Sequence, residues 1–455
     1  MSKAKCYLIR KLLLIFVLVF VLNKGEGQQY PVVLTGGTII DVTKYGNGSR
    51  DITNAIVVFQ KGKILYAGKN DKNKIPPKAR IIDIKGKYIL PGLIDCFAIL
   101  NSQSQANAYL YMGVTTVGAT IDGSFRGENI LTAKPTPRLE RMFWLDQLYE
   151  VEDTSYMRET PADIEKVSKI IDNLDSFKHS GYSIAFLHHR FPAAMYDKVV
   201  AKTRKLHMAT IGEMQYASYR EGMRKGVQAF VHTIRYSLEA YPPALRDTFI
   251  HYTKKQGRFF DWYNDTENRK KDTSLWNYAR GLARSNTALI PTLAMTYAFL
   301  EKHDNLWKET VAAILDSSEI HLPMNKQTGK WTDDPSWWKD GAADHAMTSI
   351  YIKAGCHFLT GSGTDAFGTM PGISEHMEIK LLHKYGLTTR QAIATATNNF
   401  SIFFNWTDRG LIEKGRFADI LILSANPLTD LDNLKKIERL FLKGEEISRD
   451  DLLKK

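Results

Sequence analysis

The order of apolar and polar residues divides the chain into two β-rich ends and a middle in which strands and helices alternate. Near both ends, short apolar runs are separated by Gly, Asn and Asp, a pattern typical of strands joined by turns. The strands predicted there are Val32–Leu34, Thr38–Ile40, Ala55–Phe59, Lys63–Tyr66, Ile81–Asp83, Asp419–Leu423 and Arg439–Leu442. We therefore expect one small composite β-sandwich domain, formed by residues 28–90 together with 411–455.

Residues 91–410 contain eight strand-like apolar runs with helical stretches between them. The predicted strands are Gly92–Ile99, Val114–Ala119, Leu139–Phe143, Ser183–Leu187, Ala209–Gly212, Ala229–Thr233, Ala288–Thr292 and Cys356–Gly361. Predicted helices include Ile164–His179 and Tyr196–Lys205. This alternation predicts an α/β fold, a (β/α)8 TIM-type barrel, whose functional groups collect at the C-terminal ends of the strands.

The first 27 residues have a different character from the rest. Four basic residues precede an unbroken apolar run over residues 12–22, and small residues follow at 25–27. This arrangement is typical of a signal peptide, and the apolar run is short for a membrane span. We expect residues 1–27 to be removed and the protein to be exported to the periplasm without a stable membrane anchor; an uncleaved N-terminal anchor is the alternative.

Charge and cysteine content narrow the choice of partners. Loss of residues 1–27 lowers the formal net charge from +12 to +8, because this segment carries five basic residues and one acidic residue. A moderately basic surface favours acidic small molecules or acidic polysaccharides. The sequence contains no block of Lys and Arg interleaved with aromatic residues, so nucleic-acid binding is not expected.

Cys96 and Cys356 fall near opposite ends of predicted strands, so we expect two buried thiols and no disulfide.

Several motifs lie along the predicted barrel and the segment that closes it. They are Leu90–Asp95 at the first barrel strand, 113–117 at the second, 135–138 at the third, and 386–397, 410–419 and 426–428 in the closing segment. These motifs resemble those of the amidohydrolase superfamily and occur in that family's order. The resemblance extends over roughly residues 31–445, so it implies the family's barrel and its small β domain. It also implies hydrolysis of amide, cyclic amide or dipeptide C–N bonds by one or two divalent metal ions such as zinc.

Most of the metal ligands that the resemblance implies are absent. Phe97 and Ile99 occupy the positions of a His-x-His pair after the first strand, and Phe186 stands near the lysine position of the fourth. The fifth strand ends in Glu213, with no histidine at its tip. Aromatic and aliphatic side chains offer no lone pair to a metal ion, so this end of the barrel departs from the family pattern.

Two positions retain the ligands that the resemblance implies, His232 after the sixth strand and Asp365 after the eighth. A catalytic zinc ion takes about three protein ligands. We therefore predict an enzyme without a metal cofactor. A zinc site rebuilt with Glu213, His188 or His345 is the alternative.

Polar side chains predicted at the strand ends can still transfer protons and bind an anionic substrate. His, Asp, Glu and Tyr act as general acids and bases, Arg grips carboxylates with two hydrogen bonds, and Trp faces suit sugar rings. The candidate catalytic residues are Asp365, His232, Glu213 and Tyr216. The candidate substrate-binding residues are His188, His189, Arg190, Arg235, Tyr236, Trp337 and Trp338. A packing or surface role is the alternative for each of them.

These observations favour an exported enzyme that works without the family's metal centre. Acid–base elimination, the reaction of a dehydratase or lyase, needs only a positioned base and acid. Export and basic charge favour an acidic oligosaccharide substrate, such as one containing uronate. The alternatives are a metal-dependent hydrolase of C–N bonds and a non-catalytic ligand-binding protein; association into a homo-oligomer is compatible with each of them.

Overall fold

The computed structural model describes most of the chain, and the description below is confined to that part. It covers residues 30–120, 134–145, 161–188, 191–213, 219–232, 273–300, 302–315, 319–320, 324–332, 338–364 and 368–454, with the single residues 243 and 322. The predicted signal peptide lies outside the described residues, as does most of the segment between residues 233 and 272.

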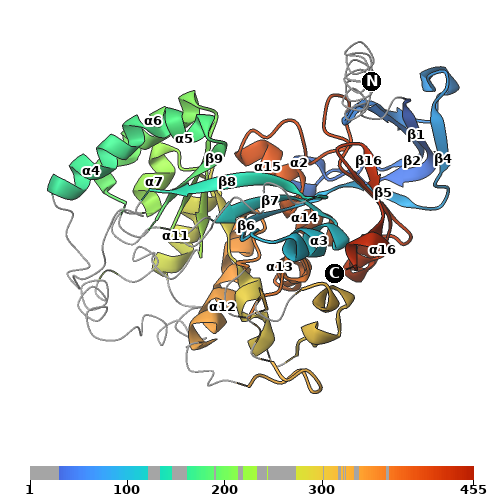
Figure 1. Ribbon diagram of the computed structural model, residues 1–455. Helices are drawn as coiled ribbons and strands as arrows, with labels where there is room; N and C mark the ends of the chain where they lie inside the picture. Colours follow the sequence, from blue (N-terminus) through green and yellow to red (C-terminus); the bar gives the residue numbers. More distant parts are fainter. Residues whose placement is uncertain are drawn as a thin grey trace, which may run out of the picture.

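Eight parallel strands form one curled sheet in the middle of the molecule, and their order in the sheet follows their order in the chain (Figure 1). They are β6 (Leu93–Ala98), β7 (Val114–Thr120), β8 (Arg138–Trp144), β9 (Tyr182–Leu187), β10 (Ala209–Gly212), β11 (Ala229–Val231), β12 (Ala288–Ile290) and β13 (His357–Phe358). The amide of Cys96 donates to Thr360 O (3.2 Å) and the amide of Gly363 to Phe97 O (2.8 Å). The sheet is therefore curled so far that its first strand lies beside the segment that follows its last.

Helices follow the strands and cover the outer side of this sheet (Figure 1). They are α3 (Gln103–Tyr111), α4 (Pro161–Asp172), α5 (Leu174–His179), α6 (Tyr196–Lys205), α7 (Tyr219–Lys225), α11 (Thr273–Ala283), α12 (Trp338–Ala354), α13 (Ile373–Lys384), α14 (Thr389–Thr395) and α15 (Asn398–Phe403). In α6 the buried residues Tyr196, Val199, Val200 and Thr203 recur at helical spacing, so one stripe faces the core. The single helix expected over residues 164–179 is wrong, because Asn173 leaves helical geometry (ψ 4°) and divides it into α4 and α5.

The two chain ends share a second, mixed sheet with the strand order β16-β15-β14-β5-β1-β2-β3, and β4 pairs with β1. Its strands are β1 (Val32–Ile39), β2 (Ile52–Gln60), β3 (Lys63–Lys69), β4 (Arg80–Asp83), β5 (Tyr88–Pro91), β14 (Ile420–Leu423), β15 (Ile437–Leu442) and β16 (Glu445–Ile447). A sandwich of two separate sheets was expected, whereas the structure has one continuous sheet. The rings of Phe59 in β2 and Phe441 in β15 nevertheless lie 5.1 Å apart. Strands are spaced about 4.8 Å apart, so this contact requires the sheet to fold over a shared core.

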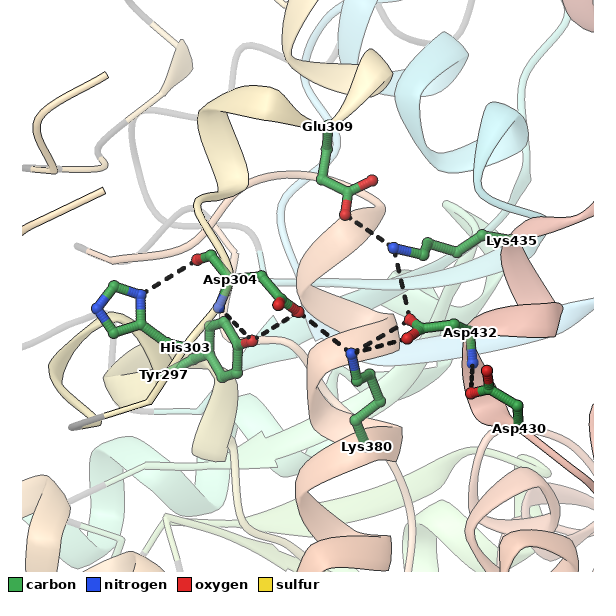
Figure 2. Close-up of polar contacts among 8 residues, drawn as sticks. All are labelled: Tyr297, His303, Asp304, Glu309, Lys380, Asp430, Asp432 and Lys435. Carbon is green, nitrogen blue, oxygen red and sulfur yellow. Dashed lines mark hydrogen bonds and ion pairs between the residues drawn. The ribbon is translucent and has the colours of Figure 1, made fainter. Parts of the chain in front are cut away.

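A polar network fastens the segment after β12 to the C-terminal part of the chain (Figure 2). This segment consists of the short 3-10 helices η5 (Leu293–Phe299), η6 (Leu306–Lys308) and η7 (Thr310–Ala313). Lys380 in α13 lies 3.2 Å from Asp304, which follows η5, and 3.2 Å from Asp432 in η10 (Leu431–Lys435). Lys435 lies 2.8 Å from Glu309. Two lysines thus join three segments that are far apart in the sequence.

Two further expectations from the sequence can be compared with the structure. Cys96 and Cys356 are both free and buried, as predicted. Within the described ranges, no helix combines the length and apolar character that crossing a bilayer requires.

Candidate active site

An aromatic layer occupies the C-terminal ends of the first, fourth and sixth strands of the curled sheet. Phe97, only 8% exposed, points its ring at Phe186 (5.5 Å between centroids) and meets the ring of His232 edge-on (5.3 Å). A Cβ on Gly361 would lie 2.7 Å from the Cβ of Phe97, so the segment after β13 approaches this ring closely because residue 361 has no side chain. Phe97, at the position where the resemblance implies a histidine, is therefore packed tightly between Phe186, His232 and the segment after β13.

The layer continues to a histidine–carboxylate pair on β9 and β10. His188, directly after β9, packs against the rings of Trp144 (4.5 Å) and Phe186 (5.4 Å). Its Nε2 lies 3.8 Å from Oε2 of Glu213, directly after β10. The amide of Glu213 donates to Leu187 O (2.8 Å), which fixes the start of the loop that carries the carboxylate. The two aromatic rings restrict the orientation of the imidazole, so that Nε2 faces the carboxylate.

A second polar pair lies at the ends of β11 and β12. Nδ1 of the buried His232 is 2.5 Å from Oγ1 of Thr292, whose hydroxyl also donates to Pro291 O (2.7 Å). A threonine hydroxyl carries one proton, so Oγ1 accepts from Nδ1–H and the Nε2 lone pair is the basic one. Thr292 was not among the predicted site residues, although a hydroxyl at the end of a predicted strand was a signal for it.

Both members of this second pair have left-handed backbone geometry. The φ angles are 51° at His232 and 53° at Thr292, a conformation that costs L residues about 1–2 kcal/mol each. Two such residues at neighbouring strand ends place the imidazole and hydroxyl side by side. Strain of this kind is concentrated at functional sites.

Asp95, which sequence analysis used only as part of a motif, ties the first strand to the loop that leads toward Asp365. It is fully buried, and its Oδ1 accepts the amide of Ser362 (2.9 Å). Burial raises the pKa of Asp95 to about 6, although hydrogen bonds from Ser362 and Phe97 act to lower it. Asp95 is two residues before Phe97, so it helps to position this end of the sheet.

The described residues do not fit the metal that the resemblance implies. Phe97, Phe186 and Ile99 offer no lone pair at the three ligand positions that the resemblance assigns to them. Within the described ranges, His, Cys, Asp and Glu nowhere come together in a group of three that could hold a metal ion. The His188–Glu213 and His232–Thr292 pairs supply acid–base groups at this end of the sheet.

The sequence-predicted site residues fall into three groups. The structure describes His188, Glu213 and His232, all at the C-terminal ends of neighbouring strands. Trp338 begins α12, but its side chain lies outside the description. Asp365, Tyr216, His189, Arg190, Arg235, Tyr236 and Trp337 lie outside the described residues.

The suggestion that His345 could help to rebuild a metal site is wrong. Its Nε2 lies 2.6 Å from Thr296 Oγ1, and its Nδ1 lies 2.8 Å from the hydroxyl of Tyr385. Burial lowers its pKa to about 3. His345 is therefore a neutral core histidine with both ring nitrogens engaged.

Comparison with known proteins agrees with this architecture. A Xaa-Pro dipeptidase with bound methionine superposes with a TM-score of 0.61 at 14% identity, over 92% of this chain and 100% of that chain. A putative prolidase from Bifidobacterium longum superposes with a TM-score of 0.60 at 18% identity, over 93% and 98%. The ochratoxinase of A. niger gives 0.59 at 13% identity, over 92% and 96%. At these identities the likeness establishes the fold.

Sequence comparison adds a family match over one part of the chain. Residues 350–447, from α12 through the end of the mixed sheet, match the model of the amidohydrolase family. No curated protein matches the chain. The matched segment contains the closing motifs noted in the sequence. The chain therefore carries an amidohydrolase-family segment over residues 350–447 and shares its fold with the similar structures over 92–93% of its length.

Proposed function

We propose that this protein hydrolyses a C–N bond of a small amide, such as a dipeptide or an N-acylated amino acid. The observation that carries this proposal is the His188–Glu213 pair, with His232 on the next strand, at the face where barrels of this type build their sites. Two of the similar structures are described as a Xaa-Pro dipeptidase and a prolidase, which supports an amide substrate. The curled sheet would then act as the closed (β/α)8 barrel expected from the sequence.

The two polar pairs have complementary roles in this proposal. His188, held by Trp144 and paired with Glu213, takes a proton from water. The resulting hydroxide attacks the amide carbonyl carbon and the C–N bond breaks. His232, oriented by Thr292 and protonated at Nε2 in the reacting form, delivers this proton to the departing nitrogen, and the proton that His188 took from water then restores it. The balance is one amide and one water consumed, and one carboxylic acid and one amine formed.

The test is product analysis with matched histidine variants. The purified protein is incubated with Xaa-Pro dipeptides and N-acyl amino acids, with chelator or with added zinc, and the products are measured by mass spectrometry. We expect amine release in chelator and a loss of about 10²-fold or more in kcat/KM for His188→Gln, Glu213→Gln and His232→Gln. His179→Gln alters an exposed histidine and serves as the control. Equal activity in all four variants would overturn the assignment.

Elimination is the second candidate, because Phe97 and Phe186 leave acid–base groups where the family uses metal ligands. A base and an acid suffice for loss of water beside a carboxylate. Hydrolysis gives two products whose masses sum to substrate plus water, whereas dehydration gives one product lighter by water. Incubation with uronate-containing oligosaccharides therefore distinguishes a lyase from the hydrolase. Ligand binding without turnover in every incubation would identify a binding protein.

We also propose that the chain is exported to the periplasm, on the basis of the basic and apolar residues within 1–27. Cell fractionation with mass spectrometry of the mature N-terminus tests this. A mature chain that begins near residue 28 in the periplasmic fraction is the expected result. A full-length chain in the cytoplasmic fraction would contradict export.

A further inference from the structure

A groove on the outer side of the curled sheet lies away from the C-terminal ends of the strands, which carry the candidate active site, and is lined by arginines. It runs between α7 and α11, which lie side by side (Figure 1), and has a volume of about 600 Å³. Arg220 and Arg224 come from α7, Arg280 from the last turn of α11, and Arg284 from the position directly after it. All four are exposed, and none of the described residues that line the groove is acidic.

The spacing of these arginines is unfavourable for the isolated helices. Each helix contributes one pair at positions i and i+4, where like charges lie on the same face and cost a few tenths of a kcal/mol. The amide of Arg284 donates to Arg280 O (3.2 Å), so helical geometry extends to the second pair. Cations near helix C-termini gain from the helix dipole. That gain explains individual arginines, but it does not explain the convergence of two pairs on one groove.

Gly281 provides an independent observation. It lies within α11 and lines the groove, and a Cβ placed on it would meet no atom within 4 Å. Glycine inside a helix costs about 1 kcal/mol relative to alanine, and here no neighbouring protein atom requires it. A missing side chain beside four arginines leaves room for a bound molecule to approach the backbone.

We propose that the groove between α7 and α11 binds a small molecule or headgroup that carries two or more phosphate or sulfate groups. Arginine forks match the oxygens of these groups and bind them bidentately. Residues four apart in a helix rise by about 6 Å, so each pair suits two anionic groups at about that separation. The volume is within the range of small-ligand sites. This inference does not depend on the proposed hydrolase activity.

The test is calorimetric titration of the whole protein with inorganic phosphate, diphosphate and a hexose bisphosphate, and sedimentation with phosphatidylcholine vesicles containing phosphatidylinositol bisphosphate. We expect the bisphosphate to bind at least ten-fold more tightly than phosphate. Arg224→Ala/Arg284→Ala should reduce this affinity about ten-fold or more. Arg50→Ala/Lys205→Ala removes the same charge from exposed positions elsewhere and should change it less than two-fold. Binding to vesicles alone would identify a lipid headgroup, and binding to the soluble bisphosphate a free ligand.

A variant that leaves the net charge unchanged distinguishes specific binding in the groove from nonspecific electrostatic attraction to the arginines. Gly281→Leu fills the groove, keeps every arginine, and replaces glycine by a better helix former. We expect it to fold and to bind the bisphosphate at least five-fold more weakly. The proposal is overturned if the wild-type protein binds none of the probes, if both double variants lose affinity equally, or if folded Gly281→Leu binds as tightly as the wild type.

Discussion

Helix α13 carries ionisable residues on two faces. The residue on the outer face forms ion pairs, whereas those on the inner face are buried without a cation. On the outer face, Lys380 lies 3.2 Å from both Asp304 and Asp432 (Figure 2). On the inner face, Glu375 and Glu378 are fully buried. Neither carboxylate oxygen of Glu375 has a hydrogen-bond partner within the described part of the chain, whereas Glu378 Oε2 accepts the amide of Ala294 (2.8 Å).

The electrostatic consequences differ accordingly. Burial acts to raise the pKa values of Asp304 and Asp432, but the nearby Lys380 ammonium leaves both below their usual range. Burial raises the pKa values of Glu375 and Glu378 well above the usual range, and the charge of Asp95 raises them further. The outer carboxylates are ionised and tie segments together. The inner carboxyls are held neutral near the strand that carries Phe97.

The largest expected effect comes from removing the inner carboxyls with Glu375→Gln/Glu378→Gln. Each wild-type carboxyl that stays protonated in the folded state but ionises in the unfolded state lowers stability by about 1.4 kcal/mol per pH unit above its ordinary pKa. Stability therefore falls as pH rises, and the variant should become increasingly more stable than the wild type as pH rises above the ordinary glutamate pKa. Urea unfolding as a function of pH measures the difference. Glu445→Gln, at an exposed position, is the control, and equal pH slopes for variant and wild type would contradict the comparison.

Asp95→Asn should have the next largest effect. The pKa of Asp95 is raised from 3.8 to about 6, so the folded state retains a proton that the unfolded state releases between those values. Wild-type stability should fall by up to about 3 kcal/mol as pH rises from about 4 to about 6, and then stay level with respect to this group. Asparagine can still accept the Ser362 amide and removes this step. If the variant shows the same fall in stability between about pH 4 and about pH 6, that fall is caused by other ionisable groups.

Lys380→Met should change stability with the opposite pH dependence, because here the stabilising interaction is lost in acid. It leaves Asp304 and Asp432 without their shared cation and keeps the apolar stem of the side chain. In the wild type, the ion pairs of Lys380 with Asp304 and Asp432 stabilise the fold above the ordinary aspartate pKa. This stabilisation is lost as pH falls through the lowered pKa values of the two aspartates. Both aspartates are about half exposed, so we expect a loss of about 1 kcal/mol at neutral pH that vanishes in acid. Thermal unfolding at both pH values measures it.

The smallest expected effect is that of Lys435→Met, on the edge of the same network. Lys435 lies 2.8 Å from Glu309 and 3.5 Å from Asp432, and solvent reaches all three side chains. We expect a loss of about 0.5 kcal/mol or less, reduced by added salt. A loss larger than that of Lys380→Met would show that the network is organised around Lys435.

Much of the fold could be read from local patterns. Ala209–Gly212 and Tyr196–Lys205 occur as predicted, because a short buried run and an amphipathic stretch each encode their own period. The break at Asn173 was missed, since the apolar spacing continues across it. The replacement of ligands by Phe97 and Phe186 was also visible without a structure. The contacts of these rings with His232 were not.

The site depended on contacts between residues far apart in the chain. His188 and Glu213 were both candidates, but no local pattern indicated that they face each other. Thr292 was overlooked because its role arises from a histidine sixty positions earlier. His345 was a plausible ligand until its two hydrogen bonds placed it in the core.

The sequence alone determined the alternation of strands and helices, the family resemblance and the loss of the expected histidines, because these are properties of neighbouring residues and of motifs. Only the tertiary structure decided which charges are paired, which acids are buried without a cation, and that four arginines from two helices line one groove. The reason is physical. Hydrogen-bond partners, burial and electrostatic environment depend on which distant segments pack together, and packing is a property of the folded chain.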